Sequence, residues 1–432
     1  MKDINTEYDL IIIGGGINGT AIAADAAGRG LSVLLCEQHD LGSGTSSWST
    51  KLIHGGLRYL EFHEFSMVRA ALNERQILLS RAPHMIRPIP FVLPHEPHLR
   101  PKWMLRTGLW IYDHLTNLET IPKTTSINLH QSKYGEPLRY DLTHGFCYYD
   151  CQTDDCRLVI LNAQSAKENG ATIVTHTQCT TAIRKTNHWD ITLQNKEDGN
   201  SIVRCKALIN ATGPWLNDVQ DNTIQHNTAS RIALVKGSHI VVRSLYQGNH
   251  AYILQNKDNR IIFTIPYQNN FTLIGTTDVD FEGNLNKISA SQDEKEYLIN
   301  LTNSYFKKNI TLDDIVWDFS GVRSLYNPNH ENPSKITREY HTEVDNSDNL
   351  PLISILGGKL TTHRKLAEDV VHHLLTTFPN LKPSWTSNTP LPGGDLDGMN
   401  LTTFTQYCQQ RYPWLPNDVL NHYIYNYGSQ IH

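Results

Sequence analysis

The sequence predicts an α/β protein in which a Rossmann-like βαβ unit is joined to a second domain built on an antiparallel sheet. Two observations carry this prediction. The apolar run 8–13 ends in a glycine cluster and is followed by a second apolar run that stops at Glu37, whereas residues 231–325 are dominated by short strand patterns separated by turn residues. With 432 residues the chain is too long for one compact core, so we expect two or three domains.

The βαβ unit carries the spacing of a dinucleotide-binding fingerprint. Gly14, Gly16 and Gly19 occupy the positions of G-x-G-x-x-G directly after the first strand, and small side chains over 20–27 let the next helix pack tightly on the sheet. The first glycine permits a sharp turn, the second lets the backbone approach a pyrophosphate, and the helix N-terminus offers free amides. Glu37 at the end of the second strand suits a ribose diol. The alternative, an ordinary tight turn, explains fewer of these features.

Composition limits the classes of partner. The formal net charge is −5, from 38 Lys and Arg against 43 Asp and Glu, so no global attraction to nucleic acid is expected. The sequence shows neither a run of 18 apolar residues nor a secretory leader, and we expect a cytoplasmic protein. The seven cysteines are expected to be reduced, and the spacing of Cys147, Cys151 and Cys156 is poor for a metal, so no metal site is predicted.

The loop 42–60 is rich in Gly, Ser and Thr, and its hydroxyls and amides are typical of a segment that follows a polar ligand. A plain Ser-rich linker is the alternative. A helix is predicted over 63–82, where apolar residues recur on one side.

Later segments return to the first domain. Residues 155–175 predict a helix followed by a strand, and 206–215 predict a buried strand that runs into the small residues of NATG, which leave room for a flat cofactor. After the strand-rich region, 351–375 predicts a strand, a Gly-Gly turn and a helix.

The segment 93–115 carries Arg100, Lys102 and Arg106 beside tryptophans and aliphatic residues. This pattern is typical of an interfacial amphipathic helix, whose aromatic residues enter the headgroup boundary while its cations meet lipid phosphates. A core-packed helix with one solvated face is the alternative.

Scattered cations indicate an anion site. Arg58, Arg323, Arg338 and Lys359 each lie among glycine, small or aromatic residues, and guanidinium groups bind phosphate in bidentate fashion. The alternative for each is a solvated surface position. His239 lies in an apolar strand and is a candidate base for an alcohol proton, with a buried, hydrogen-bonded core histidine as the alternative.

Ten ordered motifs, among them DLIIIGGGINGTAIAADAAGRGLSVLLCE, TKLIHGGLRYLE, NATGPW, VKGSHIVV, IGTTDV, SGVRSL and GGKLTTHRKLAE, resemble the family of aerobic, FAD-dependent glycerol-3-phosphate dehydrogenases of the bacterial respiratory type. The likeness is nearly full length. It implies an FAD-binding domain of the glutathione-reductase/D-amino-acid-oxidase type and oxidation of sn-glycerol 3-phosphate to dihydroxyacetone phosphate. It also implies peripheral binding to the inner face of the cell membrane and transfer of electrons to a membrane quinone.

The resemblance also assigns residues. The substrate pocket falls on Arg58, Tyr59, His239, Thr276, Arg323, Arg338 and Lys359, with Arg323 and Arg338 as a phosphate clamp, Lys359 and Arg58 near the flavin and substrate oxygens, and His239 as the base. Contacts to FAD are expected from Gly14, Gly16, Gly19, Glu37, Ser46, Ser47, Ser49, Lys51, Leu52, Ala211, Gly213, Gly358, Leu360 and Thr361.

The expected division is an FAD-binding domain of 1–62, 150–225 and 340–380, a substrate domain of 63–149 and 226–339, and an incomplete helical C-terminal domain of 388–432. The sequence stops at NYGSQIH, within that last domain of the family, so a homodimer is expected only if this C-terminus permits it. His363 stands where many family members have tyrosine.

Three other functions remain open from the sequence. One is an amine or amino-acid oxidase of the same flavin fold, although two arginines favour phosphate over a single carboxylate. The second is an NAD-dependent dehydrogenase, but this function does not account for further motifs, late in the chain, that are expected to contact the cofactor. The third is an inactive FAD-binding remnant.

Overall fold

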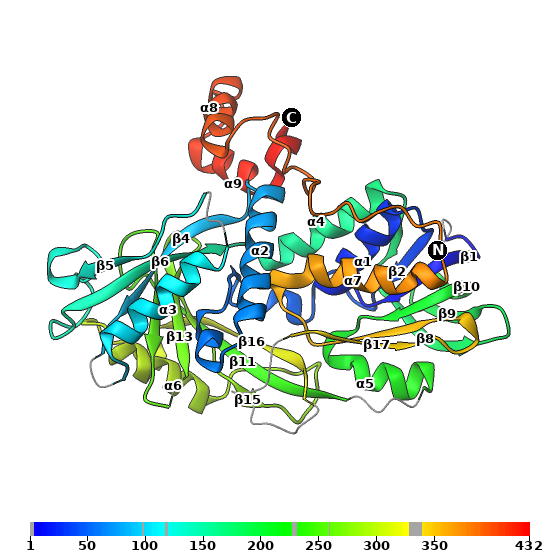
Figure 1. Cartoon of the computed structure of the whole chain (residues 1–432), viewed down its shortest axis with the longest axis horizontal. Helices are drawn as coiled ribbons and strands as arrows, with labels where there is room; N and C mark the ends of the chain where they lie inside the picture. Colours follow the sequence, from blue (N-terminus) through cyan, green and yellow to red (C-terminus); the bar gives the residue numbers. More distant parts are fainter. Residues whose placement is uncertain (1–3, 97–98, 117–119, 227–230, 259, 328–338) are drawn as a thin grey trace.

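The computed structural model places two β-sheets on either side of helix α2 (Phe65–Arg81), with the C-terminal helices above them (Figure 1). The structure describes residues 4–96, 99–116, 120–226, 231–258, 260–327 and 339–432.

The first sheet is the predicted Rossmann-like unit. Its strands pair in the order β17 (His341–Asp345), β18 (Leu352–Leu356), β10 (Gly199–Asn210), β1 (Glu7–Ile13), β2 (Val33–Cys36) and β7 (Thr172–Val174). The strands from β18 to β7 run parallel, while β17 and the hairpin of β8 (Thr177–Arg184) and β9 (Trp189–Asn195) are antiparallel additions. Helix α1 (Ile17–Gly28) links β1 to β2 as the crossover that parallel strands require. The carboxyl ends of the parallel strands therefore meet at one edge.

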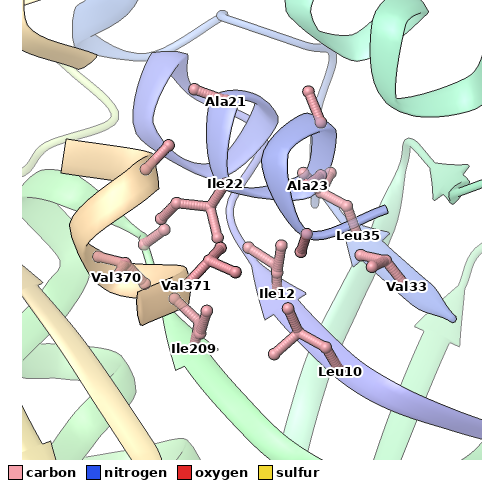
Figure 2. Packing of buried hydrophobic residues seen from close by; sticks show 14 of the residues in the cluster. Leu10, Ile12, Ala21, Ile22, Ala23, Val33, Leu35, Ile209, Val370 and Val371 are labelled. Carbon is pink, nitrogen blue, oxygen red and sulfur yellow. The ribbon is translucent and has the colours of Figure 1, made fainter. Parts of the chain in front are cut away.

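Strand β1 is buried on both faces, which explains its unbroken apolar sequence. Leu10 and Ile12 pack beneath α1 and α7 (His363–His373), as Figure 2 shows, while Ile11 and Ile13 belong to a second cluster with the β8–β9 hairpin. The alanines of α1 let this helix approach the sheet closely. Each fully buried aliphatic side chain contributes about 1.5 to 3 kcal/mol to stability.

The second sheet is mostly antiparallel. Its order is β15 (Val279–Asp280), β11 (Ile232–Arg243), β14 (Phe271–Gly275), β13 (Ile261–Tyr267), β12 (Ala251–Gln255), β4 (Arg87–Pro94), β6 (His144–Gln152) and β3 (Leu52–Ile53), with β16 (Ile315–Tyr326) on β11 and β5 (Thr125–Asn128) on β6. The prediction of an antiparallel sheet is corrected at one place, because β4 and β12 pair in parallel. These two strands come from distant parts of the chain, so no hairpin fixes their relative direction.

Helices flank both sheets. Besides α1, α2 and α7, these helices are α3 (Lys102–His114), α4 (Asp155–Glu168), the short α5 (Leu216–Asp218) and α6 (Gln292–Asn303). Short 3-10 turns lie at Thr45–Ser47, Leu57–Phe62, Leu129–Gln131, Gly213–Trp215, Leu312–Asp314, Ser347–Asn349, Leu360–Thr362, Leu374–Thr376 and Gly428–Ile431. A π turn lies at Val219–Ile224. Among its described residues, the amphipathic segment 93–115 is helical from Lys102 onward, and its first two residues close β4.

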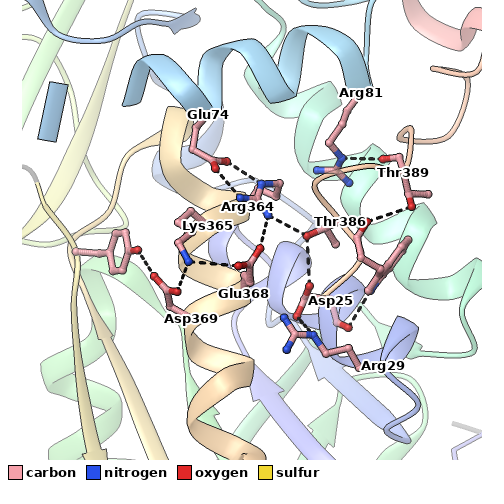
Figure 3. Close-up of polar contacts among 12 residues, drawn as sticks. Asp25, Arg29, Glu74, Arg81, Arg364, Lys365, Glu368, Asp369, Thr386 and Thr389 are labelled. Atoms are coloured by element: carbon pink, nitrogen blue, oxygen red, sulfur yellow. Dashed lines mark hydrogen bonds and ion pairs between the residues drawn. The ribbon is translucent and has the colours of Figure 1, made fainter. Parts of the chain in front are cut away.

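A buried polar network ties three helices to the segment that follows α7 (Figure 3). Arg364 donates two hydrogen bonds to Glu74 of α2 and one to Thr386, and Thr386 in turn donates to Asp25 of α1. Burial raises the pKa of Asp25 to about 6 although Arg29 lies 2.7 Å away. The network fixes the path of the chain toward its end.

The last two helices, α8 (Leu401–Arg411) and α9 (Asn417–Tyr427), pack around an apolar cluster of their own. They contact the body of the protein where Arg157 of α4 donates to the Asn426 carbonyl over 2.9 Å. The guanidinium of Arg87 also lies 4.8 Å from the centre of the Tyr425 ring.

Candidate active site

A cavity of about 410 Å³ runs from the carboxyl edge of the first sheet to the second sheet. Glu37 lines one end, and Thr276 and Arg323 line the other. A cavity at this edge is expected, because parallel α/β sheets bind ligands outside the carboxyl ends of their strands.

The glycine fingerprint shapes the first end. Gly14 has φ +108°, and a Cβ there would lie 2.7 Å from the carbonyl oxygen of Ala211. A Cβ on Gly19 would lie 1.9 Å from the Gly14 oxygen, so this glycine lets α1 approach the turn and does not line the cavity. Gly16 lines the cavity at the start of α1, where the Ile17 amide donates to Ser46 Oγ over 3.0 Å. Because Gly16 has no side chain, a phosphate can approach this helix N-terminus closely.

Glu37 is held by backbone amides. Gly15 N donates to Oε2 over 2.7 Å and His39 N donates to Oε1 over 2.8 Å. Each carboxylate oxygen can accept a further hydrogen bond. The carboxylate is therefore oriented before any ribose reaches it.

The loop after Glu37 contains some residues that line the cavity and others that hold the loop in its conformation. Of the contacts to FAD predicted in this loop, Ser46, Ser49 and Leu52 line the cavity, whereas Ser47 and Lys51 do not. Lys51 Nζ instead pairs with the fully buried Asp155 at 2.6 Å, because a cation at this depth needs an anionic partner. Ser47 Oγ donates to the Gly42 carbonyl over 2.6 Å. Ser47 and Lys51 hold the loop in shape.

The predicted contacts of the later segments all reach the cavity wall. They are Ala211, Gly213, Gly358, Leu360 and Thr361. His54 N donates to Thr361 Oγ1 over 3.2 Å. This hydrogen bond joins the loop 42–60 to the 3-10 turn that precedes α7.

Three neighbouring strands supply the far end. In β11 Val235 pairs with Arg323 of β16, and Thr276 and Asp278 follow β14. Arg323 donates from Nη1 to Asp278 Oδ1 over 2.6 Å and from Nη2 to Thr276 Oγ1 over 3.2 Å. A Cβ on Gly237 would lie 2.6 Å from Arg323 Nη2, so only glycine leaves room for the guanidinium there.

Arg58, Tyr59 and Lys359 also line the cavity. Lys359 Nζ lies 4.3 Å from the centre of the Tyr59 ring. Three of the four predicted cations, Arg58, Arg323 and Lys359, therefore line one cavity, and their convergence on a single anion stays a prediction. Arg338, the other half of the predicted clamp, lies outside the described residues.

His239 lies behind the wall rather than on it. The side chain is 1% exposed, its ring stacks on Phe319 at 4.7 Å, and its Nε2 lies 3.0 Å from Thr50 Oγ1. Burial, with the nearby cations Arg323 and Lys51, holds the pKa of this imidazole well below its usual value. The ring is therefore neutral at neutral pH and is separated from the cavity by Thr50.

Sequence reasoning did not single out Thr50, Asp155 and Asp278. Thr50 and Asp278 line the cavity, and Asp155 supports it. Each of them lies in a segment whose predicted role rests on its other residues. The role of these three depends on contacts that only the three-dimensional structure shows.

The sequence model of the FAD dependent oxidoreductase family, DAO, matches residues 9–350. The chain belongs to this family. A glycerol-3-phosphate dehydrogenase of Pseudomonas aeruginosa is 47% identical over 98% of this chain and 82% of its own length. A D-erythritol 1-phosphate dehydrogenase of Brucella abortus is 45% identical over 98% and 84%. The structure is similar to that of the glycerol-3-phosphate dehydrogenase from Bacillus halodurans complexed with FAD, with TM-score 0.79 and 27% identity over 99% of this chain and 77% of that one.

The predicted family, fold and cofactor are confirmed. The site also fits FAD on its own geometry, because the cradle at Gly14 and Gly16 would be filled by side chains and the oriented carboxylate of Glu37 suits a ribose. The nicotinamide alternative is not compatible with this family. Among the described residues no cluster of His, Cys, Asp and Glu has the arrangement of a metal site.

Proposed function

We propose that this protein oxidises the secondary alcohol of sn-glycerol 3-phosphate to the ketone of dihydroxyacetone phosphate. The observation that carries the proposal is that Arg58, Arg323 and Lys359 all line the cavity that Glu37 also lines. It is supported by the name of the Pseudomonas aeruginosa relative. When bound, FAD supplies the oxidant that takes up hydride from the alcohol carbon.

The cations select the phosphate group. A guanidinium bonded to phosphate contributes roughly 1.5 to 3 kcal/mol per charge-assisted hydrogen bond. A substrate without phosphate cannot form these hydrogen bonds, so glycerol itself is expected to be a very poor substrate. A carboxylate needs fewer cations, which makes the amino-acid oxidase alternative less suitable.

A second candidate substrate is D-erythritol 1-phosphate, which the Brucella abortus relative favours through its name and 45% identity. Both compounds are phosphate esters of a polyol, and they differ in the length of the carbon chain. The cation cluster alone binds either phosphate, so the choice depends on the space left for the rest of the substrate.

The decisive experiment is anaerobic bleaching of the yellow flavin in the purified protein. Rapid loss of flavin absorbance with glycerol 3-phosphate, and slower loss with erythritol 1-phosphate, is the expected result. Glycerol and glycine serve as controls for the phosphate requirement and for the amino-acid oxidase alternative. Bound FAD that no substrate bleaches would instead support an inactive remnant.

We also propose peripheral binding to the inner face of the cell membrane through α3 and the neighbouring 3-10 turn. Trp103, Met104 and Trp110 of α3 are 71%, 45% and 60% exposed, and Phe62 of the turn is 46% exposed. Arg100 bonds Glu61 of the turn over 2.7 Å, which joins the two segments into one surface. We call Phe62, Trp103, Met104 and Trp110 the aromatic patch. Among the described residues no helix has the length and apolar character needed to cross a bilayer.

A membrane quinone is the acceptor that fits such a location. Phe62 of the patch lies on the same 3-10 turn that supplies Arg58 and Tyr59 to the cavity, so the proposed membrane contact and the cavity share one structural element. The expected homodimer stays a prediction.

A further inference from the structure

Thr50 and His239 form a contact to which the proposed binding of substrate assigns no role. Thr50 lines the cavity, and its Oγ1 lies 3.0 Å from His239 Nε2. His239 does not line the cavity. Phe319 stacks on one face of its ring at 4.7 Å, and the backbone of Gly275 lies so close that a Cβ there would be 2.1 Å from His239 Cδ2. The ring therefore has little room to turn toward the cavity.

Nε2 is the ring nitrogen through which His239 reaches a polar neighbour. Its Nδ1 is buried and has no hydrogen-bond partner in the described part of the chain. A hydroxyl both donates and accepts, so Thr50 can bond either tautomer of the imidazole. Among the described residues, the Thr50 hydroxyl is the polar group that joins the His239 ring to the cavity, so it offers the path for a proton between them.

We infer that Thr50 relays the proton of the substrate alcohol to His239. The inference rests on the proposed oxidation of a phosphorylated alcohol. The substrate O–H bond breaks and its proton passes to Thr50 Oγ1, while the proton that Thr50 carried passes to His239 Nε2. The hydrogen on the alcohol carbon leaves with its electron pair to FAD, the oxidant, and the C=O bond forms. After the product leaves, the imidazolium returns its proton through Thr50 to water.

The charged groups around His239 make this relay depend on the phosphate. Arg323, which pairs with Asp278, and Lys51, which pairs with Asp155, are the cations that disfavour a charged imidazole. A phosphate dianion on Arg323 offsets one of them and so raises the proton affinity of His239. An alcohol that lacks phosphate meets the same imidazole with both cations acting on it, and the base is then weaker.

The test compares Thr50→Ser, which keeps the hydroxyl, with Thr50→Val, which removes it at nearly the same size. General base catalysis typically contributes 10² to 10⁴, so Thr50→Val should slow anaerobic flavin reduction by glycerol 3-phosphate by about 100-fold or more. Thr50→Ser should stay within about threefold of the parent. The double variant Thr50→Val/His239→Asn should be no slower than the slower single variant, because both changes interrupt one path.

A second readout does not depend on turnover. In protein labelled with ¹⁵N-histidine and free of substrate, the His239 signals, assigned by their absence in His239→Asn, should shift in Thr50→Val and return close to the parent in Thr50→Ser. FAD content and thermal midpoint, measured for each variant, separate a folding defect from loss of the relay. If Thr50→Val does not fold, Thr50→Ala takes its place.

The outcomes separate two failures. A parent protein that binds FAD but is not bleached by any phosphorylated polyol overturns the proposed function and the relay with it. A parent that is bleached, together with a Thr50→Val protein that is bleached at the parental rate, overturns the relay alone. A slow Thr50→Ser protein also overturns it, because the hydroxyl would then be insufficient.

Discussion

Arg323 donates from Nη1 to Asp278 Oδ1 over 2.6 Å, so this cation on the cavity wall already has an anionic partner. The side chains are 25% and 11% exposed, and the pair is screened by solvent only in part. A phosphate ester that reaches Arg323 must therefore share the guanidinium with a carboxylate. The ion pair holds the guanidinium in place, and the charge of Asp278 affects how tightly Arg323 binds a second anion.

Replacement of Arg323 should affect the substrate far more than the cofactor. Arg323→Ala removes up to two charge-assisted hydrogen bonds to phosphate, and we expect KM for glycerol 3-phosphate to rise about 100-fold or more. FAD content should match that of the parent. Arg204→Ala, which breaks a more exposed pair with Asp190, is the control and should leave KM unchanged. Equal affinity of Arg323→Ala and the parent for glycerol 3-phosphate would contradict the clamp.

Neutralising Asp278 should have the opposite effect on anion affinity. Asp278→Asn keeps an oxygen that can accept from Arg323 but removes a negative charge beside the phosphate position. Inorganic phosphate, measured as a competitive inhibitor of glycerol 3-phosphate oxidation, should bind severalfold more tightly. An unchanged inhibition constant would show that Asp278 does not act on the phosphate electrostatically.

The sequence predicted those parts of the site that local pattern determines. The strand, turn and helix around Gly14 follow from apolar periodicity and glycine spacing, and the structure places them as predicted. Lys51 was assigned to the cofactor, but it pairs with Asp155, a residue distant in sequence that no local pattern connects to it. His239 was placed in the pocket because its motif is there, whereas strand register puts its ring against Phe319 and behind Thr50. Long-range pairing decides such positions, and a single sequence carries little of it.

The third fingerprint glycine should be needed for folding around the cofactor. Gly19→Ala places a Cβ 1.9 Å from the Gly14 oxygen, and backbone cannot yield as a flexible side chain does. We expect α1 to be displaced, FAD content after purification to fall at least tenfold, and the thermal midpoint to drop. Gly108→Ala is the control, because a Cβ in that helix of the aromatic patch meets nothing within 4 Å. It should stabilise slightly, by up to about 1 kcal/mol.

His363 should make the protein acid-labile. Burial lowers the pKa of His363 to about 3, and its Nδ1 donates to the Leu360 carbonyl over 2.7 Å. In the unfolded chain this imidazole, with a pKa near 6.5, takes up a proton at pH values at which the native imidazole stays neutral. The contribution of His363 to the free energy of unfolding is therefore fully present above pH 6.5 and falls as the pH falls. From pH 7 to pH 5 the loss due to this one residue is about 2 kcal/mol.

Denaturant unfolding at pH 7 and pH 5 measures this loss. His363→Gln should lose about 2 kcal/mol less than the parent between the two pH values, whatever its stability at pH 7. His372→Gln, an exposed change on the same helix, should lose as much as the parent. An identical loss in all three proteins would show that His363 is not a source of acid sensitivity.

The aromatic patch should bind vesicles rather than stabilise the fold. Trp103 and Trp110 leave water only when the patch meets a membrane, and each contributes on the order of 1.5 kcal/mol to that transfer. Trp103→Ser/Trp110→Ser should therefore reduce cosedimentation with anionic phospholipid vesicles at least tenfold and leave glycerol 3-phosphate oxidation with a soluble dye unchanged. Trp414→Ser removes a tryptophan that is also 71% exposed but lies near the C-terminus, so this control should bind vesicles as the parent does. Equal loss in the control would mean that the binding follows exposed tryptophan in general and not the surface beside the cavity.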